Sequence, residues 1–237
     1  MVVKTFPMVA GTTFGRHSHD DHQLAWATRG VLTVHTDEAT WVLPPTRALW
    51  IPAGVRHVTR ASGATTMRTV YLHPDRCPVD WPAPTPVAVG GLLAELIAHL
   101  EDASVHGARR ARAEGVLIDL LAPLRIATIE LRMPRDPRAL DVANALVHNP
   151  ASRRTLGRWG HEVGAGERTL ARAFLAETGV SFGRWRTQLR LQAALPILAE
   201  GGSVASASDR AGYESPSAFV AAFRRETGMT PAEYFRD

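Results

Sequence analysis

The strongest constraint on this 237-residue chain is a repeat near its C-terminus. The segment LARAFLAETGVS, which begins at Leu170, aligns with FVAAFRRETGMT, which begins at Phe219, at an offset of 49 residues. The triplet ETG recurs at 177–179 and 226–228, and one phenylalanine holds the same place in each copy. A repeat of this kind predicts one supersecondary unit that is present twice.

Each copy of the repeat has the signals of a helix that ends at a glycine. In the second copy, Ser215 is a favourable N-cap, Pro216 suits the first helical position and Gly228 ends the helix. Phe219 and Phe223 lie four residues apart and therefore share one face. A shorter helix is predicted before each copy, in TLGRWGHEVG and in SVASASDRAGY, which makes two helix-turn-helix patterns. A single pattern would fit a structural helical hairpin, but two copies in register favour DNA binding.

The second copy resembles the signature of AraC/XylS-type transcriptional regulators. The residues that carry the resemblance are Gly212, Tyr213, Ser215, Ser217, Phe219, Phe223, Gly228, Pro231 and Tyr234. The resemblance covers residues 138–237 and implies two helix-turn-helix units that each place a recognition helix in the major groove. It also implies a long joining helix over residues 181–202. We expect Pro196 to kink or break that helix, because proline lacks an amide donor and clashes with the preceding turn.

The candidate DNA-binding residues are those on the outer faces of the two predicted recognition helices. They are Arg168, Thr169, Ala171 and Arg172 in the first helix and Ser217, Val220, Ala221, Arg224 and Arg225 in the second. Two arginines one turn apart can reach guanine edges or phosphates, whereas small side chains permit close docking and contact with thymine methyl groups. We therefore predict that the first unit reads sequence and that the second docks and contacts phosphates. The alternative is that Arg168 and Arg172 only solvate a helix surface.

The N-terminal half of the chain has the pattern of an all-β domain. From Phe14 to Leu72, short β-rich runs (LAWAT, VLTVHT, TWVLP, ALWIP, RHVTR, MRTVYL) alternate with turn residues. Many short strands at even spacing predict a small barrel or sandwich. The predicted fold class is therefore α+β, with an N-terminal β-barrel followed by an all-α domain that contains two helix-turn-helix units.

Two segments of this half resemble the two cupin motifs. The first is Gly11-x5-His17-x-His19-x3-Gln23-x6-Gly30, and the second is Thr46-x5-Pro52-x-Gly54-x2-His57-x3-Ala61. The resemblance implies a cupin barrel with a sensor pocket. The chain departs from the pattern at Gln23, where enzymatic cupins carry Glu, and at Thr46 and Ala61, where the motif has Gly and Asn.

The histidines of these motifs are candidate metal ligands. His17 and His19 lie two apart on a predicted strand and so point to the same side, where His57 can join them, with Gln23 as a fourth, neutral ligand. Three imidazoles suit Zn, Ni, Fe, Mn or Cu. His22 has the opposite parity and is predicted to be a surface or edge residue. The alternative is a pocket whose histidines bind an effector by hydrogen bonds without a metal.

Two amphipathic helices are predicted between the halves, over residues 87–103 and 108–133. Each has an apolar stripe, formed by Leu92, Leu93, Leu96, Ile97 and Leu100 in the first and by Val116, Leu117, Leu120, Leu121 and Leu124 in the second. The stripes either pack against the predicted sheet and each other or form the interface of a homodimer.

Composition places the chain among ordinary globular proteins, with 45% hydrophobic and 21% charged residues. It has no apolar run that is long enough for a membrane helix, and Cys77 is the only cysteine, so no internal disulfide can form. These features favour a cytoplasmic protein. We expect three segments: a cupin sensor domain at 1–82, a helical linker and dimerisation segment at 83–137, and a DNA-binding domain at 138–237.

The sequence thus predicts a transcription regulator and not an enzyme. Its cupin domain is expected to sense a metal ion or small effector and to modulate sequence-specific binding to double-stranded DNA. RNA polymerase is an expected further partner, and no membrane is involved. The alternative is a metal-dependent cupin enzyme, of the oxygenase or isomerase type, fused to a DNA-binding domain.

Overall fold

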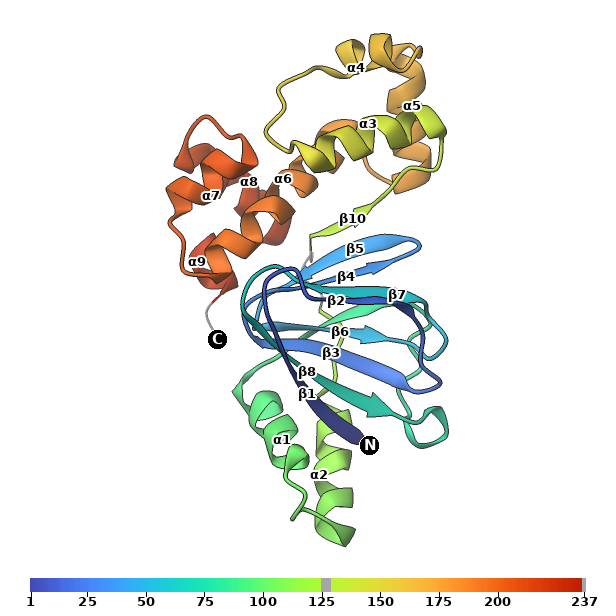
Figure 1. Ribbon diagram of the computed structural model, residues 1–237, viewed down its shortest axis with the longest axis vertical. Coiled ribbons are helices and arrows are strands. Elements are labelled where there is room, and N and C mark those ends of the chain that lie inside the picture. Colours follow the sequence, from blue (N-terminus) through green and yellow to red (C-terminus); the bar gives the residue numbers. More distant parts are fainter. Residues whose placement is uncertain (125–128, 236–237) are drawn as a thin grey trace. The chain divides into compact units, whose positions relative to one another are not determined.

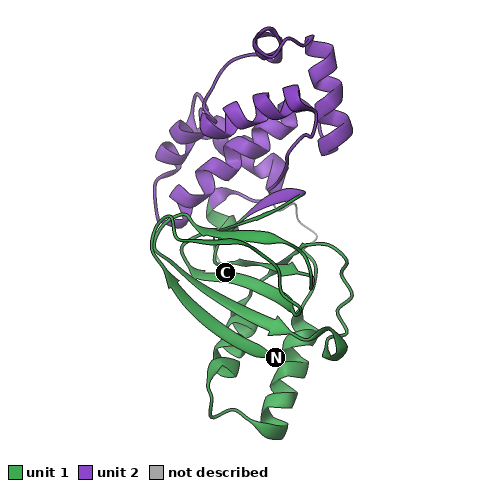
Figure 2. Ribbon diagram, turned by 45° about the vertical axis from the view of Figure 1, so that its right-hand side comes forward, with its two compact units in different colours: residues 1–37, 42–128, 232–237 green, residues 38–41, 129–231 purple. Residues whose placement is uncertain are grey.

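The computed structural model describes residues 1–124 and 129–235. The chain divides into two compact units, which Figure 2 shows in different colours. The first unit comprises residues 1–37, 42–128 and 232–237, and the second comprises residues 38–41 and 129–231. Within the described residues, no helix has both the length and the apolar character that a membrane crossing requires.

The strands of the first unit form two antiparallel sheets (Figure 1). They are β1 (Val2–Met8), β2 (Thr13–His17), β3 (His22–Arg29), β4 (Leu32–Thr36), β5 (Ala39–Leu43), β6 (Arg47–Ile51), β7 (His57–Ala61), β8 (Thr65–Leu72) and β9 (Thr85–Ala88). One sheet has the order β1-β8-β3-β6-β9, and the other contains β5, β4, β7 and β2 in that order. All six β-rich runs predicted between Phe14 and Leu72 are strands, and the predicted α+β class is confirmed.

A glycine of the first cupin-like motif makes the tight turn between β3 and β4. Gly30 has a φ of 77°, in the left-handed region that glycine adopts at little cost. A Cβ at this position would lie 2.5 Å from the carbonyl oxygen of Ala64 and 2.7 Å from Oγ1 of Thr65. Both the backbone conformation and the space therefore require glycine here, which explains this element of the motif in physical terms.

Helices α1 (Gly91–Glu101) and α2 (Gly107–Leu120) pack together and against the first sheet. Their buried leucines and isoleucine share one core with strand residues, among them Leu24, Trp50 and Val70. Most of the two predicted apolar stripes are therefore internal packing surface. Leu92 and Val116 are the exceptions, with 64% and 46% of their surface exposed.

Both linker helices are shorter in the structure than the sequence predicts. Val87 lies in β9, so the first helix begins only at Gly91. The second ends at Leu120, because Pro123 cannot continue a helix, so Leu121 and Leu124 of its stripe lie beyond the helix. Residues 125–128 of the prediction lie outside the described part of the chain, and Glu130–Arg132 forms strand β10 instead of helix.

The second unit is mainly helical. Its helices are α3 (Pro137–His148), α4 (Leu156–Glu162), α5 (Glu167–Thr178), α6 (Phe182–Ala199), α7 (Val204–Ala211) and α8 (Pro216–Thr227), and α9 (Pro231–Tyr234) follows at the end of the chain. Strand β10 pairs with residues 39–41 of β5, and Leu131 enters a core with Phe174 and Trp185. The indole of Trp185 also donates to the carbonyl of Arg132 at 2.7 Å.

The sequence repeat corresponds to a repeat of helices and of individual hydrogen bonds in the structure. The pairs α4–α5 and α7–α8 are the two predicted helix-turn-helix units, and α6 joins them. The hydroxyl of Thr178 donates to the carbonyl of Phe174 at 2.6 Å and accepts from the amide of Val180 at 3.4 Å. Thr227 makes the same pair of bonds in the second unit, at 2.8 Å and 3.3 Å.

Of the kink or break expected at Pro196, the break is wrong, because α6 continues through this residue to Ala199; the kink stays a prediction. The helix is well buried in the turn that precedes the proline, where Leu191, Ala194 and Leu195 are each 0% exposed. This packing offsets the amide bond that proline cannot make. The helix ends one turn later, where the amide of Gly202 returns to the carbonyl of Ile197 at 2.8 Å.

Candidate functional site

Three imidazoles converge in the first unit. His17 is the last residue of β2, His19 follows that strand, and His57 opens β7, with His17 and His57 directly opposite each other in the sheet. The centroid of the His17 ring lies 4.7 Å from that of the His19 ring and 4.4 Å from that of the His57 ring. One ring nitrogen from each residue lies within 4.8 Å of the others, close enough to share a metal ion.

Backbone carbonyls determine which nitrogen of two of these rings is available. Nδ1 of His17 lies 2.6 Å from the carbonyl of Gly15, and Nδ1 of His57 lies 3.0 Å from the carbonyl of Val55. A carbonyl only accepts, so each Nδ1 carries the proton and leaves the Nε2 lone pair free for a ligand. The Nε2 atoms of His19 and His57 are buried, and no hydrogen-bond partner for them is found in the described chain. This arrangement fits a metal site, because metal-bound histidines are oriented in the same way.

The environment also favours the neutral form that binds metals. Burial lowers the pKa of His19, and the nearby His17 lowers it further. Burial is likewise the largest cause of the lowered pKa of His57, with smaller effects from the bond to Val55, which raises it, and from His17 and His19, which lower it. Both rings therefore remain neutral to a lower pH than an exposed histidine does.

A cavity of about 450 Å³ opens beside the histidines. His17, His19 and Gln23 line it together with the apolar side chains of Phe6, Phe14 and Met67 and the ring of Tyr71. Nε2 of Gln23 donates to Thr69 at 3.0 Å, whereas Oε1 of Gln23 is buried and finds no partner among the described residues. The predicted fourth ligand thus lines the same cavity as two of the histidines, with its amide oxygen unsatisfied.

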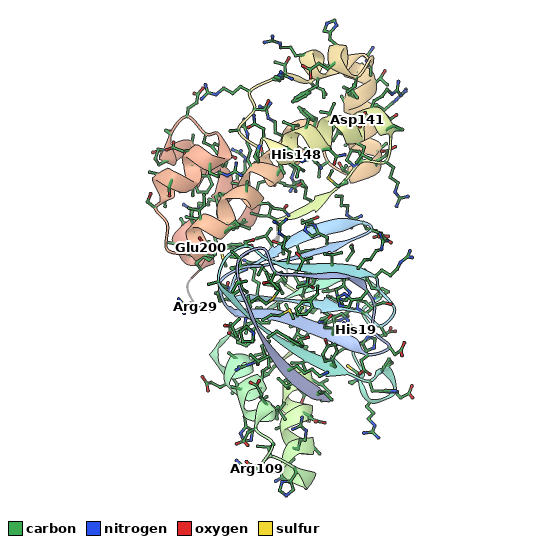
Figure 3. All side chains as sticks on the ribbon, in the orientation of Figure 1. His19, Arg29, Arg109, Asp141, His148 and Glu200 are labelled. Carbon is green, nitrogen blue, oxygen red and sulfur yellow. The ribbon has the colours of Figure 1, made fainter. Side chains whose placement is uncertain are left out.

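Two details of this site differ from the sequence expectation. His19 does not share a strand with His17 but lies just beyond the end of β2. Its side chain is labelled in Figure 3. His22 is separate from the three-histidine group, as its parity predicted. It is not a simple surface residue, however, because its ring stacks on Trp50 at 4.8 Å and accepts the amide of Ala53 at 3.1 Å.

The apolar wall of the cavity lies partly outside the predicted β-rich region. Phe6 belongs to β1, which precedes the runs predicted from Phe14 onward; Pro7 is tolerated in this strand because β1 lies at the edge of its sheet. Met67 and Tyr71 lie on β8, in the predicted run MRTVYL, and they alternate on one face with Thr69. That alternation was a usable signal for the pocket side of the strand.

The candidate residues of the first recognition helix, α5, lie on its outer face. Arg168, Ala171 and Arg172 are exposed and Thr169 is half-buried, whereas Leu170 and Phe174 face the core. In the described part of the chain, no carboxylate lies within 4.0 Å of Arg168 or Arg172. Both guanidinium groups are therefore available for an anionic or base-edge partner.

The candidate residues of the second recognition helix, α8, line one shallow groove. The groove holds about 700 Å³, and Ser217, Val220, Ala221, Arg224 and Arg225 all border it. The side chain of Ser215 caps this helix by accepting the amide of Ala218 at 3.2 Å. The structure thus brings all five predicted residues of α8 to one surface.

Comparisons with known proteins cover both units. Residues 3–121 match the family described as the AraC-like ligand binding domain, and residues 159–237 match the family described as the helix-turn-helix domain. Among solved structures, ToxT from Vibrio cholerae aligns over 98% of this chain and 97% of its own, at 11% identity and a TM-score of 0.41.

Two curated relatives are HTH-type transcriptional regulators. RipA of Corynebacterium glutamicum is 39% identical over 110 residues, which are 46% of this chain and 33% of RipA. NimR of Escherichia coli (strain K12) is 30% identical over 223 residues, which are 92% of this chain and 81% of NimR. With a ligand-binding domain followed by a helix-turn-helix domain and a relative that matches along most of its length, the chain belongs to the AraC family of transcriptional regulators.

Proposed function

We propose that this regulator senses a metal ion, or a small effector held beside that metal, and adjusts its binding to double-stranded DNA in response. The observation that carries the proposal is the convergence of His17, His19 and His57 with their ligand atoms within 4.8 Å. Imidazole ligands suit Zn, Ni, Fe, Mn or Cu, and the amide oxygen of Gln23 is a weaker fourth donor. No step of this function requires turnover, so the chain acts as a sensor and not as an enzyme.

The chemistry of the cavity supports a small effector of mixed character. Phe6, Phe14 and Met67 supply apolar surface, and His17, His19 and Gln23 supply polar groups. Sites for small molecules combine such an apolar wall with a few polar groups that fix orientation. A ligand that binds one conformation more tightly shifts the population towards it, and only this differential affinity is needed for a response.

For DNA, we propose that the first recognition helix reads sequence and the second docks closely and contacts phosphates. Arg168 and Arg172, which are exposed and have no carboxylate partner among the described residues, support the first role. The small side chains of Ser217 and Ala221 beside two arginines support the second. In this proposal residues 1–82 form the sensor, residues 83–137 link it to the DNA-binding domain, and residues 138–237 bind DNA. A cytoplasmic homodimer that contacts RNA polymerase is the corresponding assembly.

The DNA assignment is tested by replacing the two arginines after an operator has been selected from random duplexes. Arg168→Ala or Arg172→Ala should weaken specific binding by about 1–3 kcal/mol and relax the base preference at one or two positions. Arg109→Ala is the matched control, because Arg109 is exposed on α2 in the other unit. Ser217→Ala should have a smaller effect than Arg168→Ala. Equal weakening on all sequences would instead make that arginine a phosphate contact.

A further inference from the structure

A second polar cavity lies within the helical unit, at the N-terminal end of α8. It holds about 560 Å³, and its polar lining comes from three segments: the loop before α4, the first half of α6 and the turn before α8. The polar residues are Arg153, Arg186, Thr187, Arg190, Tyr213 and Glu214. Three arginines against one glutamate give the cavity a positive formal charge.

Carbonyl groups orient two of the arginines without neutralising them. Nη1 of Arg186 donates to the carbonyl of Arg154 at 3.1 Å, and its Nη2 donates to Ser152. Arg190 donates to the carbonyl of Pro150 and to that of Ser152, each at 3.1 Å. Among the residues that the structure describes, no carboxylate lies within 4.0 Å of Arg186 or Arg190. Their charges are therefore fixed in place but uncompensated.

The same cavity holds polar atoms that lack partners. Nε of Arg186 and the hydroxyl of Tyr213 are buried, and neither finds a hydrogen-bond partner in the described protein. Buried groups of this kind normally have a partner, and both the Nε–H of Arg186 and the hydroxyl of Tyr213 can donate to an anion in the cavity. Burial also lowers the pKa of Arg186, and the neighbouring Arg190 lowers it further, which is the effect of gathered positive charge.

The one carboxylate of the lining does not remove this charge. Glu214 lies 3.5 Å from Nη1 of Arg153, but the two side chains are 83% and 70% exposed. An exposed pair of this kind contributes little and is readily exchanged. A phosphate would offer several acceptor oxygens to the preoriented guanidinium groups, which bind such anions well.

We propose that this cavity binds a phosphate group and that, in the complex with DNA, the occupant is a phosphate of the duplex backbone. The cavity includes Ala218, on the first turns of α8, whose neighbour Ser217 borders the recognition groove. A phosphate held here would fix the position of the second unit on the duplex, as backbone contacts do in other DNA-binding proteins. This inference rests on the proposed DNA binding.

The test places a negative charge in the cavity. Thr187→Glu supplies an internal carboxylate to the arginines, and Thr187→Gln is the matched neutral control of similar size. Binding of a 25-base-pair duplex of random sequence is followed by fluorescence anisotropy between 50 and 200 mM KCl. Compared with Thr187→Gln, the Glu variant should bind about threefold or more weakly at 50 mM, and the slope of log K against log [KCl] should be smaller by about 0.9. Equal affinities and equal slopes would overturn the assignment to DNA.

A second variant works in the opposite direction. Glu214→Gln removes the only carboxylate of the lining and, because Glu214 is exposed, it should leave the fold intact. It should tighten binding of the same duplex at low salt, whereas unchanged or weaker binding counts against a phosphate in this cavity.

Inorganic phosphate distinguishes a backbone phosphate from a free one. Thermal unfolding of both Thr187 variants is followed in phosphate and in chloride at matched ionic strength. Phosphate should stabilise the Gln variant more than the Glu variant. If this difference appears while both variants bind duplex alike, the occupant is a free phosphate and the assignment to DNA is overturned. If neither phosphate nor DNA distinguishes the variants, the site itself is disproved. A wild-type chain that binds no duplex would instead refute the proposed DNA binding, and the phosphate titration would then decide the cavity alone.

Discussion

At the scale of single residues, the three-histidine group depends on two backbone carbonyls as much as on the histidines. Gly15 and Val55 accept the Nδ1 protons of His17 and His57 and so direct the Nε2 atoms of those rings towards a shared point. Partners of this kind fix both the tautomer and the orientation of a ligand. The group is therefore organised for coordination before any ion binds.

His19→Ala should sharply reduce metal binding, because it removes one of at most four protein donors. We expect at least a tenfold fall in affinity, measured as metal content after dialysis against the metal. His22→Ala is the matched control: it loses the stack on Trp50 but no atom of the group, so its metal content should stay at the wild-type level. Equal metal content in wild type and His19→Ala would end the metal hypothesis.

The lowered pKa values of His19 and His57 predict how the stability of the metal-free chain depends on pH. Because the pKa of His57 is lowered in the folded state, the unfolded chain binds protons more tightly. The free energy of unfolding should therefore fall as the pH drops below about 6.5, by at most about 1.4 kcal/mol per pH unit for each histidine. Well above that pH these groups contribute nothing.

Urea unfolding in a chelating buffer, at several pH values between 8 and 5, measures this dependence. His57→Gln should show a shallower decline than the wild type, since it lacks one of the depressed groups. Parallel curves for the two proteins would show that His57 does not carry the effect.

At the scale of elements, the two helix-turn-helix units share one device for ending a helix. In each, a buried threonine hydroxyl donates to the carbonyl one turn back and accepts an amide two residues ahead, beside a glycine in the left-handed conformation. Each hydroxyl thereby gives a partner to the first amide beyond the terminal glycine, that of Val180 or Met229. The ETG triplet is thus repeated because the same cap is needed twice.

Thr178→Val and Thr227→Val should destabilise the chain by similar amounts, about 1–2 kcal/mol each, because the amide two residues ahead loses its hydroxyl partner at nearly constant volume. Thr187→Val is the control. The Thr187 hydroxyl only donates, to the carbonyl of Gly183 at 3.0 Å, so removing it should lower the free energy of unfolding by less. Chemical denaturation of the three variants provides the comparison. A large difference between Thr178→Val and Thr227→Val would show that the two caps are not equivalent.

At the scale of the whole molecule, the proposed function requires that the sensor pocket and the DNA-binding helices influence each other. If they do, loading with metal or effector should change DNA affinity by a factor of about 5–150, which is the usual range of such coupling. The same factor must appear in the reverse experiment, because coupling between two binding equilibria is reciprocal.

Metal titrations with and without a selected duplex, followed by calorimetry, measure the reverse factor. His19→Ala provides the control, since it should bind duplex with an affinity that added metal no longer changes. A wild-type chain whose metal affinity is the same with and without DNA would contradict the sensor proposal while leaving the DNA-binding assignment intact.

Local patterns were sufficient for many of the elements. The six β-rich runs between Phe14 and Leu72 are strands, and both copies of the repeat are helices that end at the expected glycine, the second with the expected Ser215 cap. These features depend on interactions between residues that are close together in the chain, such as the bond between Ser215 and Ala218, so they can be predicted from the sequence. Motif spacing also indicated that His17, His19 and His57 lie together, although the parity argument for His19 does not apply, because His19 lies beyond β2.

Long-range packing decided the rest. Pro196 predicts a kink or a break by its local chemistry, but α6 continues through it, with buried leucines in the turn that precedes it. Strand β1 precedes the predicted runs and contains Pro7, which is tolerated because β1 lies at a sheet edge and pairs with β8. Segments far apart in the chain come together in two places. One is the cavity wall formed by Phe6, Phe14 and Tyr71, and the other is the cluster of Arg153, Arg186 and Arg190. Sequence alone therefore determined the local elements, the repeat and the ligand types, whereas only tertiary packing decided which distant side chains meet, because that depends on contacts with no local pattern.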